Sequence, residues 1–191
     1  MSSITVIGTG NMGTAIAALA EKGGATVQTL GHADTDTAVT GDIVVLAVPY
    51  PALAEIAATR AQELAGRIVV DITNPVNFAT FDSLTVPADS SAAAELAEAL
   101  PGSQVLKAFN TNLGPTLATG QIGNQTTTVL IAGDDAQAKT ALAEVITAAG
   151  LGAVDAGALS RARELEAIGF LQITLAATEK ISWTGGLALI K

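Results

Sequence analysis

The stretch Ser2-Ser-Ile-Thr-Val-Ile-Gly-Thr-Gly-Asn-Met-Gly13, continued as far as His32, decides the fold of this chain. A short apolar run rich in β-branched residues, 4–7, leads without a gap into the glycine turn 8–13. Apolar residues then recur at helical spacing until Gly23-Gly24, and a second β-rich run follows at Thr26–Leu30. Strand, glycine turn, helix and strand in this order are the first half of a dinucleotide-binding unit.

Each glycine of the turn has a separate physical task. Gly8 lets the chain turn tightly out of the strand, Gly10 removes a side chain where a pyrophosphate must approach, and Gly13 lets helix and strand pack closely. The amides of Thr9 to Met12 then lie at a helix N-terminus, where unpaired N–H groups and the helix dipole favour an anion. A simple tight turn is the alternative, but the flanking strand and helix are the context that the dinucleotide motif requires.

The composition favours a sheet covered by helices. The chain has 191 residues, enough for one sizeable core, and 49% of them are apolar but only 3% are aromatic. Such aliphatic runs are typical of buried parallel strands. No segment approaches the roughly 18 consecutive apolar residues of a membrane span, and the N-terminus lacks the basic region of a signal peptide. With no cysteine there is no disulfide framework or thiolate site, so we expect a cytoplasmic protein.

The charged residues exclude several classes of function. A formal net charge of −9, without a lysine or arginine cluster, argues against nucleic acid as a partner. His32 is the single histidine, which excludes a histidine-cluster metal site and makes a Ser-His-Asp triad improbable. We therefore expect neither a metal site nor a nucleic-acid partner.

The end of the second strand bears on the choice of nucleotide. A NAD-preferring site usually carries Asp or Glu about 20 residues after the glycines, bonded to the ribose 2′-hydroxyl. Here the strand ends Leu30-Gly31-His32, with no acid until Asp34. Thr9, Gly31 and His32 are therefore predicted to surround a 2′-phosphate, which favours NADP over NAD although no arginine is present. An exposed loop histidine is the alternative for His32.

The rest of the chain continues the β-α alternation with one gap. The next buried strand, 42–48, begins only about ten residues after the second, too close for a helix-plus-strand crossover. One β-α element is therefore predicted to be missing, which leaves the second strand at a sheet edge. The further elements predicted are a helix from Pro51 to Gly66, a strand at 67–72, a loop at 77–91, a helix at 91–100 capped by Ser91, strands at 104–109 and 126–132, a helix at 136–149, a strand at 151–154 and a final helix at 161–181 capped by Ser160.

These elements predict a Rossmann-like α/β fold, a doubly wound and mostly parallel sheet that lacks one β-α element of its first half. Residues 1–158 are predicted to form the nucleotide-binding domain. Residues 159–191 are predicted to form a helical segment that packs on this domain or is swapped between subunits. Trp183 and Leu187 in this segment suit a homodimer or another partner.

Five motifs that occur in order resemble one family. They are Gly8-Thr-Gly-Asn-Met-Gly13, Ala47-Val-Pro-Tyr50, Asp71-Ile-Thr-Asn-Pro75, Lys107-Ala-Phe-Asn-Thr111 and Asp155-Ala-Gly-Ala-Leu-Ser160. Over nearly its whole length the chain resembles the NADP reductases that use the deazaflavin coenzyme F-420, together with their bacterial relatives. The resemblance implies hydride exchange between NADP(H) and a small deazaflavin- or flavin-like acceptor.

The resemblance also implies a set of cofactor-binding residues. Residues 9–12 would bind the pyrophosphate, Gly31-His32 would lie at the 2′-phosphate, Val48-Pro49 would line the ribose side, and two Asn-containing turns would lie near the nicotinamide. The full set is Gly8, Thr9, Gly10, Asn11, Met12, Gly13, Gly31, His32, Ala47, Val48, Pro49, Tyr50, Asn74, Pro75, Asn110 and Thr111. The segment from Trp183 to Leu187 would help to wall the acceptor pocket. Gly31-His32 stands where the family has Ser-Arg, which weakens the expected grip on a 2′-phosphate.

Hydride transfer is chemistry that the cofactor carries, so we expect no catalytic nucleophile or general base. Asn74 and Asn110 have an alternative reading as turn-forming residues after strands, and Tyr50 as a partly exposed aromatic. Two other functions stay open: a non-catalytic module that senses NADP, and a short relative of imine reductases or hydroxyacid dehydrogenases. Both of those enzyme families add a large helical domain, for which one final helix is too little.

Overall fold

Seven strands form one sheet in the order β2-β1-β3-β4-β5-β8-β9 in the computed structural model, which describes residues 2–190. All neighbouring strands are parallel except β5 and β8, which are antiparallel. The predicted Rossmann-like, mostly parallel α/β fold is therefore confirmed. The strands are β1 (Ser3–Ile7), β2 (Thr26–Leu30), β3 (Ile43–Leu46), β4 (Ile68–Asp71), β5 (Gln104–Lys107), β8 (Thr128–Gly133) and β9 (Gly152–Gly157), and β6 (Gln121–Ile122) with β7 (Gln125–Thr126) forms a separate small hairpin.

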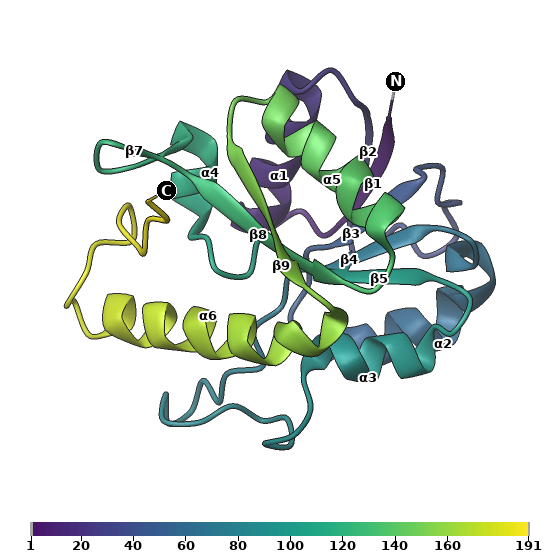
Figure 1. The fold of residues 1–191 in the computed structure, drawn as a ribbon. Coiled ribbons are helices and arrows are strands. Elements are labelled where there is room, and N and C mark those ends of the chain that lie inside the picture. Colours follow the sequence, from purple (N-terminus) through teal and green to yellow (C-terminus); the bar gives the residue numbers. More distant parts are fainter. Residues whose placement is uncertain (1, 191) are drawn as a thin grey trace.

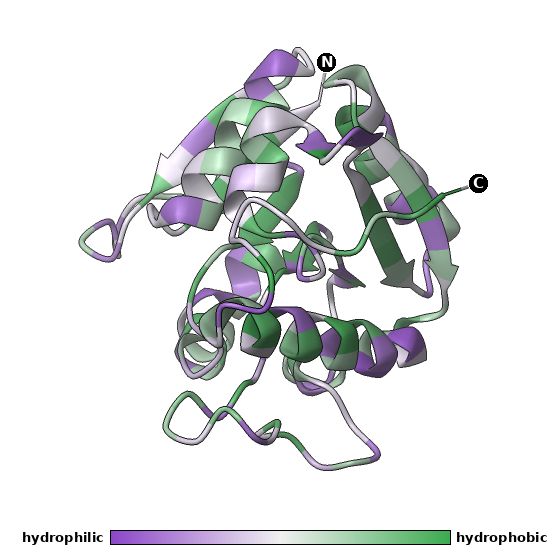
Figure 2. Cartoon of the chain, turned by 90° about the vertical axis from the view of Figure 1, so that its left-hand side faces the viewer, coloured by the Kyte–Doolittle hydropathy of each residue, from purple (hydrophilic) through white to green (hydrophobic). Residues whose placement is uncertain are grey.

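Helices cover both faces of the sheet (Figure 1). The helices α1 (Asn11–Lys22), α4 (Gly114–Thr119) and α5 (Ala136–Ala148) lie on one face, and α2 (Ala52–Leu64), α3 (Ala92–Ala99) and α6 (Ala162–Ala177) lie on the other. Each face buries its own aliphatic cluster, around Ile16 and Leu142 on the first face and around Leu53 and Leu96 on the second. Figure 2 shows the resulting hydrophobic strands between the two layers, with the loop before α3 projecting away from the body.

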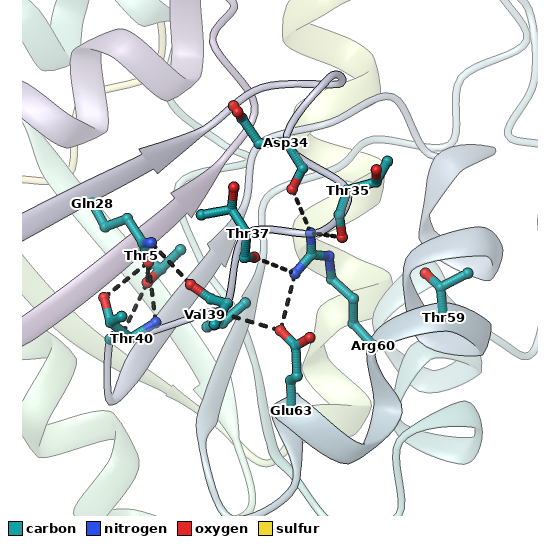
Figure 3. Close-up of polar contacts among 12 residues, drawn as sticks. Thr5, Gln28, Asp34, Thr35, Thr37, Val39, Thr40, Thr59, Arg60 and Glu63 are labelled. Carbon is teal, nitrogen blue, oxygen red and sulfur yellow. Dashed lines mark hydrogen bonds and ion pairs between the residues drawn. The ribbon is translucent and has the colours of Figure 1, made fainter.

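The loop between β2 and β3 confirms that one β-α element is missing. Residues 31–42 contain no helix, and β2 is an edge strand of the sheet. The side chain of Gln28 ties this loop to the strands: its Oε1 accepts from the Thr40 amide at 3.0 Å and from the buried Thr5 hydroxyl at 2.8 Å. Its Nε2 donates to the Ala38 carbonyl at 2.9 Å (Figure 3). A network of polar side chains thus replaces the missing element.

Two details of the C-terminal helix differ from the predictions. Ser160 does not cap α6, because it lies within a short 3₁₀ turn, Leu159–Arg161, and Arg161 occupies the N-cap position without a side-chain bond. The helix also ends at Ala177 rather than near residue 181. Glu179 adopts a left-handed φ of 59°, and the amide of Lys180 donates to the carbonyl of Leu175. This bonding closes the helix in the manner of a Schellman motif.

Candidate dinucleotide site

The glycine turn contains two glycines that the fold requires and one that borders open space. A Cβ atom at Gly8, where φ is +122°, would lie 2.1 Å from the Ala47 carbonyl oxygen, and one at Gly13 would lie 2.0 Å from the Gly8 carbonyl oxygen. At these two positions a side chain would clash with backbone atoms, so the fold itself requires glycine. A Cβ at Gly10 would meet no atom within 4 Å. Gly10 is also the N-cap of α1, with no side-chain cap bond, so the start of this helix faces an open region.

The carboxyl ends of the parallel strands bring other predicted residues to the same edge of the sheet. The Ala47 amide, just after β3, donates to the carbonyl of Ile7 at the end of β1, at 2.8 Å. The turn after β5 also reaches the glycine turn, because a Cβ at Gly114 would lie 3.6 Å from the Met12 sulfur. The glycine turn, Ala47 and the segment after Asn110 therefore share one edge, as parallel strands require.

Asn74 and Asn110, both predicted near the nicotinamide, are bonded to each other. The Asn74 Nδ2 donates to the Asn110 carbonyl at 2.8 Å, and the Asn110 Nδ2 donates to the Asn74 Oδ1 at 2.9 Å and to the Leu165 carbonyl at 2.8 Å. Phe109, with a left-handed φ of 61°, turns the chain after β5 immediately before this pair. The buried Oδ1 of Asn110 has no hydrogen-bond partner among residues 2–190. These side chains hold two strand ends together at the proposed site.

The C-terminal helix approaches this pair through residues that the sequence reading missed. A Cβ at Gly169 would lie 2.2 Å from the Asn74 Oδ1, so only glycine permits this packing of α6. Buried Gln172 donates to the Thr111 carbonyl at 2.7 Å and accepts from the Leu187 amide at 2.8 Å. The segment after α6 is therefore fixed beside the Asn turns. Gly169, a glycine in the middle of a helix, was the signal in the sequence that could have indicated this close packing.

The predicted residues after β3 and β4 have varied surroundings. Val48 packs against the core on the side of α2, Pro49 is exposed and Pro75 is buried. The Tyr50 hydroxyl donates to the Glu95 carboxylate at 2.6 Å, and burial together with this carboxylate raises the pKa of Tyr50 to about 12. Its ring lines a cavity of about 190 Å³ whose other walls belong to α2 and α3. A contact between Tyr50 and the nucleotide stays a prediction.

At the end of β2 the structure adds a carboxylate to the predicted pair. A Cβ at Gly31 would lie 3.6 Å from the Thr9 side chain, so Gly31 faces the glycine turn as expected. His32 is exposed. The Gly31 amide donates to the Asp34 Oδ2 at 2.7 Å, which holds this carboxylate beside Gly31 and Thr9. The sequence reading placed no acid at this point.

A buried cluster of three charged residues lies under the same sheet edge. The Lys107 ammonium is 2.8 Å from a carboxylate oxygen of Asp71 and 2.8 Å from one of Glu166, and all three side chains are fully buried. Glu166 also accepts from the amides of Ala92 and Ala93, at 3.0 and 3.3 Å, so it caps the start of α3 from α6. Asp71 and Lys107 stand in the quoted motifs, but their pairing with Glu166 was not predicted. Two carboxylates share one cation in this cluster.

Burial raises the pKa of Glu166 above its ordinary value of 4.5, although Lys107 opposes the shift. The folded protein therefore binds this proton more tightly than the unfolded chain does, so its contribution to stability is complete below about pH 4.5 and is lost as the pH rises through the raised pKa. We expect the free energy of unfolding of wild type, relative to Glu166→Gln, to fall as the pH rises above about 5 and through the raised pKa. Urea unfolding across this range measures it, and a difference that rises with pH would contradict the assignment.

Within residues 2–190, no cluster of three or more histidine, cysteine, aspartate or glutamate side chains is placed to hold a metal ion. Over the same residues, every helix falls short of the length and apolar character needed to cross a bilayer.

Comparisons with known proteins identify relatives of this chain. Residues 19–75 match the family model described as NADP oxidoreductase, coenzyme F420-dependent. The F420-dependent NADP reductase of Methanocaldococcus jannaschii is 31% identical over 160 residues, which cover 82% of this chain and 71% of that protein. The metalloreductase STEAP3 of Rattus norvegicus is 38% identical over 109 residues, but the match spans only 21% of its length and 56% of this chain.

Solved structures extend the comparison to the fold. A candidate F420-dependent NADP reductase from Arthrobacter sp. FB24 has a TM-score of 0.86 and 23% identity, with 100% of both chains covered. The hypothetical protein SMa0349 of Sinorhizobium meliloti has a TM-score of 0.71 and 27% identity, over 84% of this chain and 87% of that one.

Fold and glycine turn together define a Rossmann-like protein with an open glycine turn at the carboxyl edge of its sheet. The chain belongs to the family of F420-dependent NADP reductases. This family consists of NADP-dependent oxidoreductases, which confirms the predicted class of enzyme and its nucleotide.

Proposed function

We propose that this protein transfers a hydride between NADP(H), bound at the glycine turn, and a deazaflavin- or flavin-like small molecule. The open start of α1 supports this proposal most directly, because the space above Gly10 is free while the two flanking glycines are closed by backbone. A helix N-terminus without a side-chain cap suits a diphosphate, whose oxygens accept from free amides. The M. jannaschii relative is an F420-dependent NADP reductase, and its name supports the same pair of reactants.

The protein's own residues would bind and orient the two reactants. Amides of Thr9 to Met12 would hold the pyrophosphate, and the turns that carry Asn74 and Asn110 would fix the nicotinamide end, because each is already held by the other and by α6. The bound nicotinamide supplies the hydride, so positioning and exclusion of water are the tasks left to the protein.

Residues 159–191 are proposed to complete the acceptor side of this site, as a segment distinct from the nucleotide-binding domain at 1–158. The Gln172 bonds to Thr111 and Leu187 support this proposal, because they hold the end of the chain next to the Asn turns. Large apolar side chains on α6 and this segment remain exposed: Leu171, Trp183, Leu187, Leu189 and Ile190. Figure 2 shows the hydrophobic tail near the C-terminus. Such an exposed apolar surface favours the homodimer that the sequence suggested. The homodimer and a cytoplasmic location both stay predictions.

Stopped-flow oxidation of bound NADPH against coenzyme F420, FMN, quinones and ferric chelates tests the proposed reaction. Fast reoxidation by a deazaflavin or flavin, with saturation in the acceptor, is the expected result. Tight NADPH binding without turnover by any acceptor would instead favour a nucleotide-sensing module. Turnover confined to an imine or a hydroxyacid would place the protein with those reductases.

His32→Ala is expected to weaken NADPH binding by about three- to tenfold and to leave NADH binding unchanged, because His32 is exposed at the end of β2 and free to donate to a 2′-phosphate. Isothermal titration calorimetry with both nucleotides measures the two effects. An equal loss for NADH would remove His32 from the phosphate role and place it against the adenine, which both nucleotides carry.

A further inference from the structure

We infer that Asp34 is a specificity-determining residue that reads the ribose 2′ position, so that this enzyme accepts NADH as well as NADPH. The inference rests on the proposed nucleotide site at the glycine turn. Asp34 lies four residues beyond the end of β2 in sequence, yet its carboxylate is brought back to the strand end by the Gly31 amide, at 2.7 Å. The position is therefore the one at which a carboxylate meets the ribose hydroxyls in dinucleotide sites.

The Asp34 carboxylate lies close to Gly31, as the Thr9 side chain of the glycine turn does. The atoms nearest to a Cβ built on Gly31 are the Asp34 Oδ2 at 3.5 Å and the Thr9 side chain at 3.6 Å. Asp34 and Thr9 thus border the same side of Gly31, where a ribose would rest between strand end and glycine turn. Because Gly31 carries no side chain, the space beside this strand end is left to the Asp34 carboxylate.

Arg60, on α2, holds the loop in this conformation. Its nearly buried guanidinium donates to the carbonyls of Asp34, Thr35 and Thr37, at 2.8, 2.8 and 3.0 Å, and pairs with Glu63 at 2.9 Å. Figure 3 shows the Asp34 carbonyl turned down to this guanidinium while the carboxylate points away from it. Arg60 therefore positions the loop backbone and leaves the Asp34 charge unneutralised.

The arginines near this loop are committed to its backbone. Arg67 donates to the carbonyls of Val39 and Gly41 at the far end of the loop. The sequence between Lys22 and Arg60 contains no lysine or arginine. A 2′-phosphate would therefore meet His32 as a donor but also the Asp34 carboxylate, a like charge that opposes it. A free 2′-hydroxyl would instead donate a charge-assisted hydrogen bond to that carboxylate.

Asp34→Asn tests this assignment without disturbing the loop, because the Asn oxygen can still accept from the Gly31 amide. Asp36→Asn, which removes the same charge from an exposed position two residues away, is the matched control. Calorimetry of the protein with NADH and NADPH gives the affinities, and AMP and adenosine 2′,5′-bisphosphate isolate the ribose end. Wild type should bind NADH within about tenfold of NADPH.

Asp34→Asn is expected to tighten NADPH and adenosine 2′,5′-bisphosphate by about tenfold or more and to weaken NADH and AMP several-fold, whereas Asp36→Asn changes each by less than about twofold. Equal effects of the two substitutions, or no change in the ratio of NADPH to NADH affinity, would overturn the role of Asp34 while leaving the nucleotide site intact. Failure of wild type to bind either dinucleotide would instead refute the proposed function.

Discussion

Gly10→Val weakens the binding of NADPH and NADH by at least about a hundredfold and leaves the melting temperature within about 2 °C of wild type. The first expectation follows because the valine side chain would occupy the space that the diphosphate needs, at a cost of two or more charge-assisted hydrogen bonds of about 1.5–3 kcal/mol each. The second follows because no atom lies within 4 Å of the new Cβ and the backbone of Gly10 is extended, which suits valine.

Gly13, in the same glycine turn, provides the contrasting variant. Gly13→Ala puts a Cβ 2.0 Å from the Gly8 carbonyl oxygen, so α1 must move away from the turn and the protein loses stability together with binding. Calorimetry and thermal unfolding of both variants separate the two kinds of glycine. If Gly10→Val retains wild-type affinity, the diphosphate does not bind above Gly10 and the assignment of the turn is wrong.

Lys107→Met is expected to lower the free energy of unfolding by about 3–5 kcal/mol, because it leaves Asp71 and Glu166 buried together without a cation. At roughly 2–4 °C per kcal/mol for a chain of this size, the melting temperature should fall by about 10 °C. The loss should grow with rising pH, since protonation of Glu166, whose pKa burial raises, relieves its repulsion with Asp71. Urea unfolding at several pH values measures both effects.

The double variant Lys107→Met with Glu166→Gln is the control for this prediction. Removing the second carboxylate is expected to restore part of the stability and to reduce the dependence on pH, because a single buried acid remains. If the loss of stability in the double variant equals the sum of the losses in the two single variants, Lys107 and Glu166 act independently, contrary to the 2.8 Å ion pair.

Local patterns were sufficient to predict most of the fold. The aliphatic runs of β1, β3 and β4, the glycines that follow β1 and the Ser91 cap of α3 are encoded within a few residues, and each lies where it was predicted. The short link after His32 correctly predicted β2 as an edge strand. The helix α4 and the hairpin β6–β7 were missed, although Pro115 in the first turn and Gly120 with a φ of 74° are ordinary start and stop signals.

The candidate site was predicted less completely because much of it depends on long-range contacts. Gly169 against Asn74, Gln172 against Thr111 and Glu166 against Lys107 join α6 to turns far away in the sequence. Asp34 lies four residues beyond β2, and a turn that returns its side chain to the strand end leaves no periodic signal in the sequence. The prediction that Ser160 caps α6 was wrong for a related reason: one 3₁₀ turn shifts the start of the helix by one residue.

The cap that Glu166 places on α3 constrains how the protein is made. The two amides that it accepts from lie more than seventy residues earlier, the amide of Ala92 being 74 positions away. Synthesis from the N-terminus therefore delivers strands β1 to β5, Lys107 and the start of α3 well before the carboxylate that completes them. The charged cluster of Asp71, Lys107 and Glu166 is therefore incomplete until α6 has been made, and the start of α3 lacks its cap until the same moment.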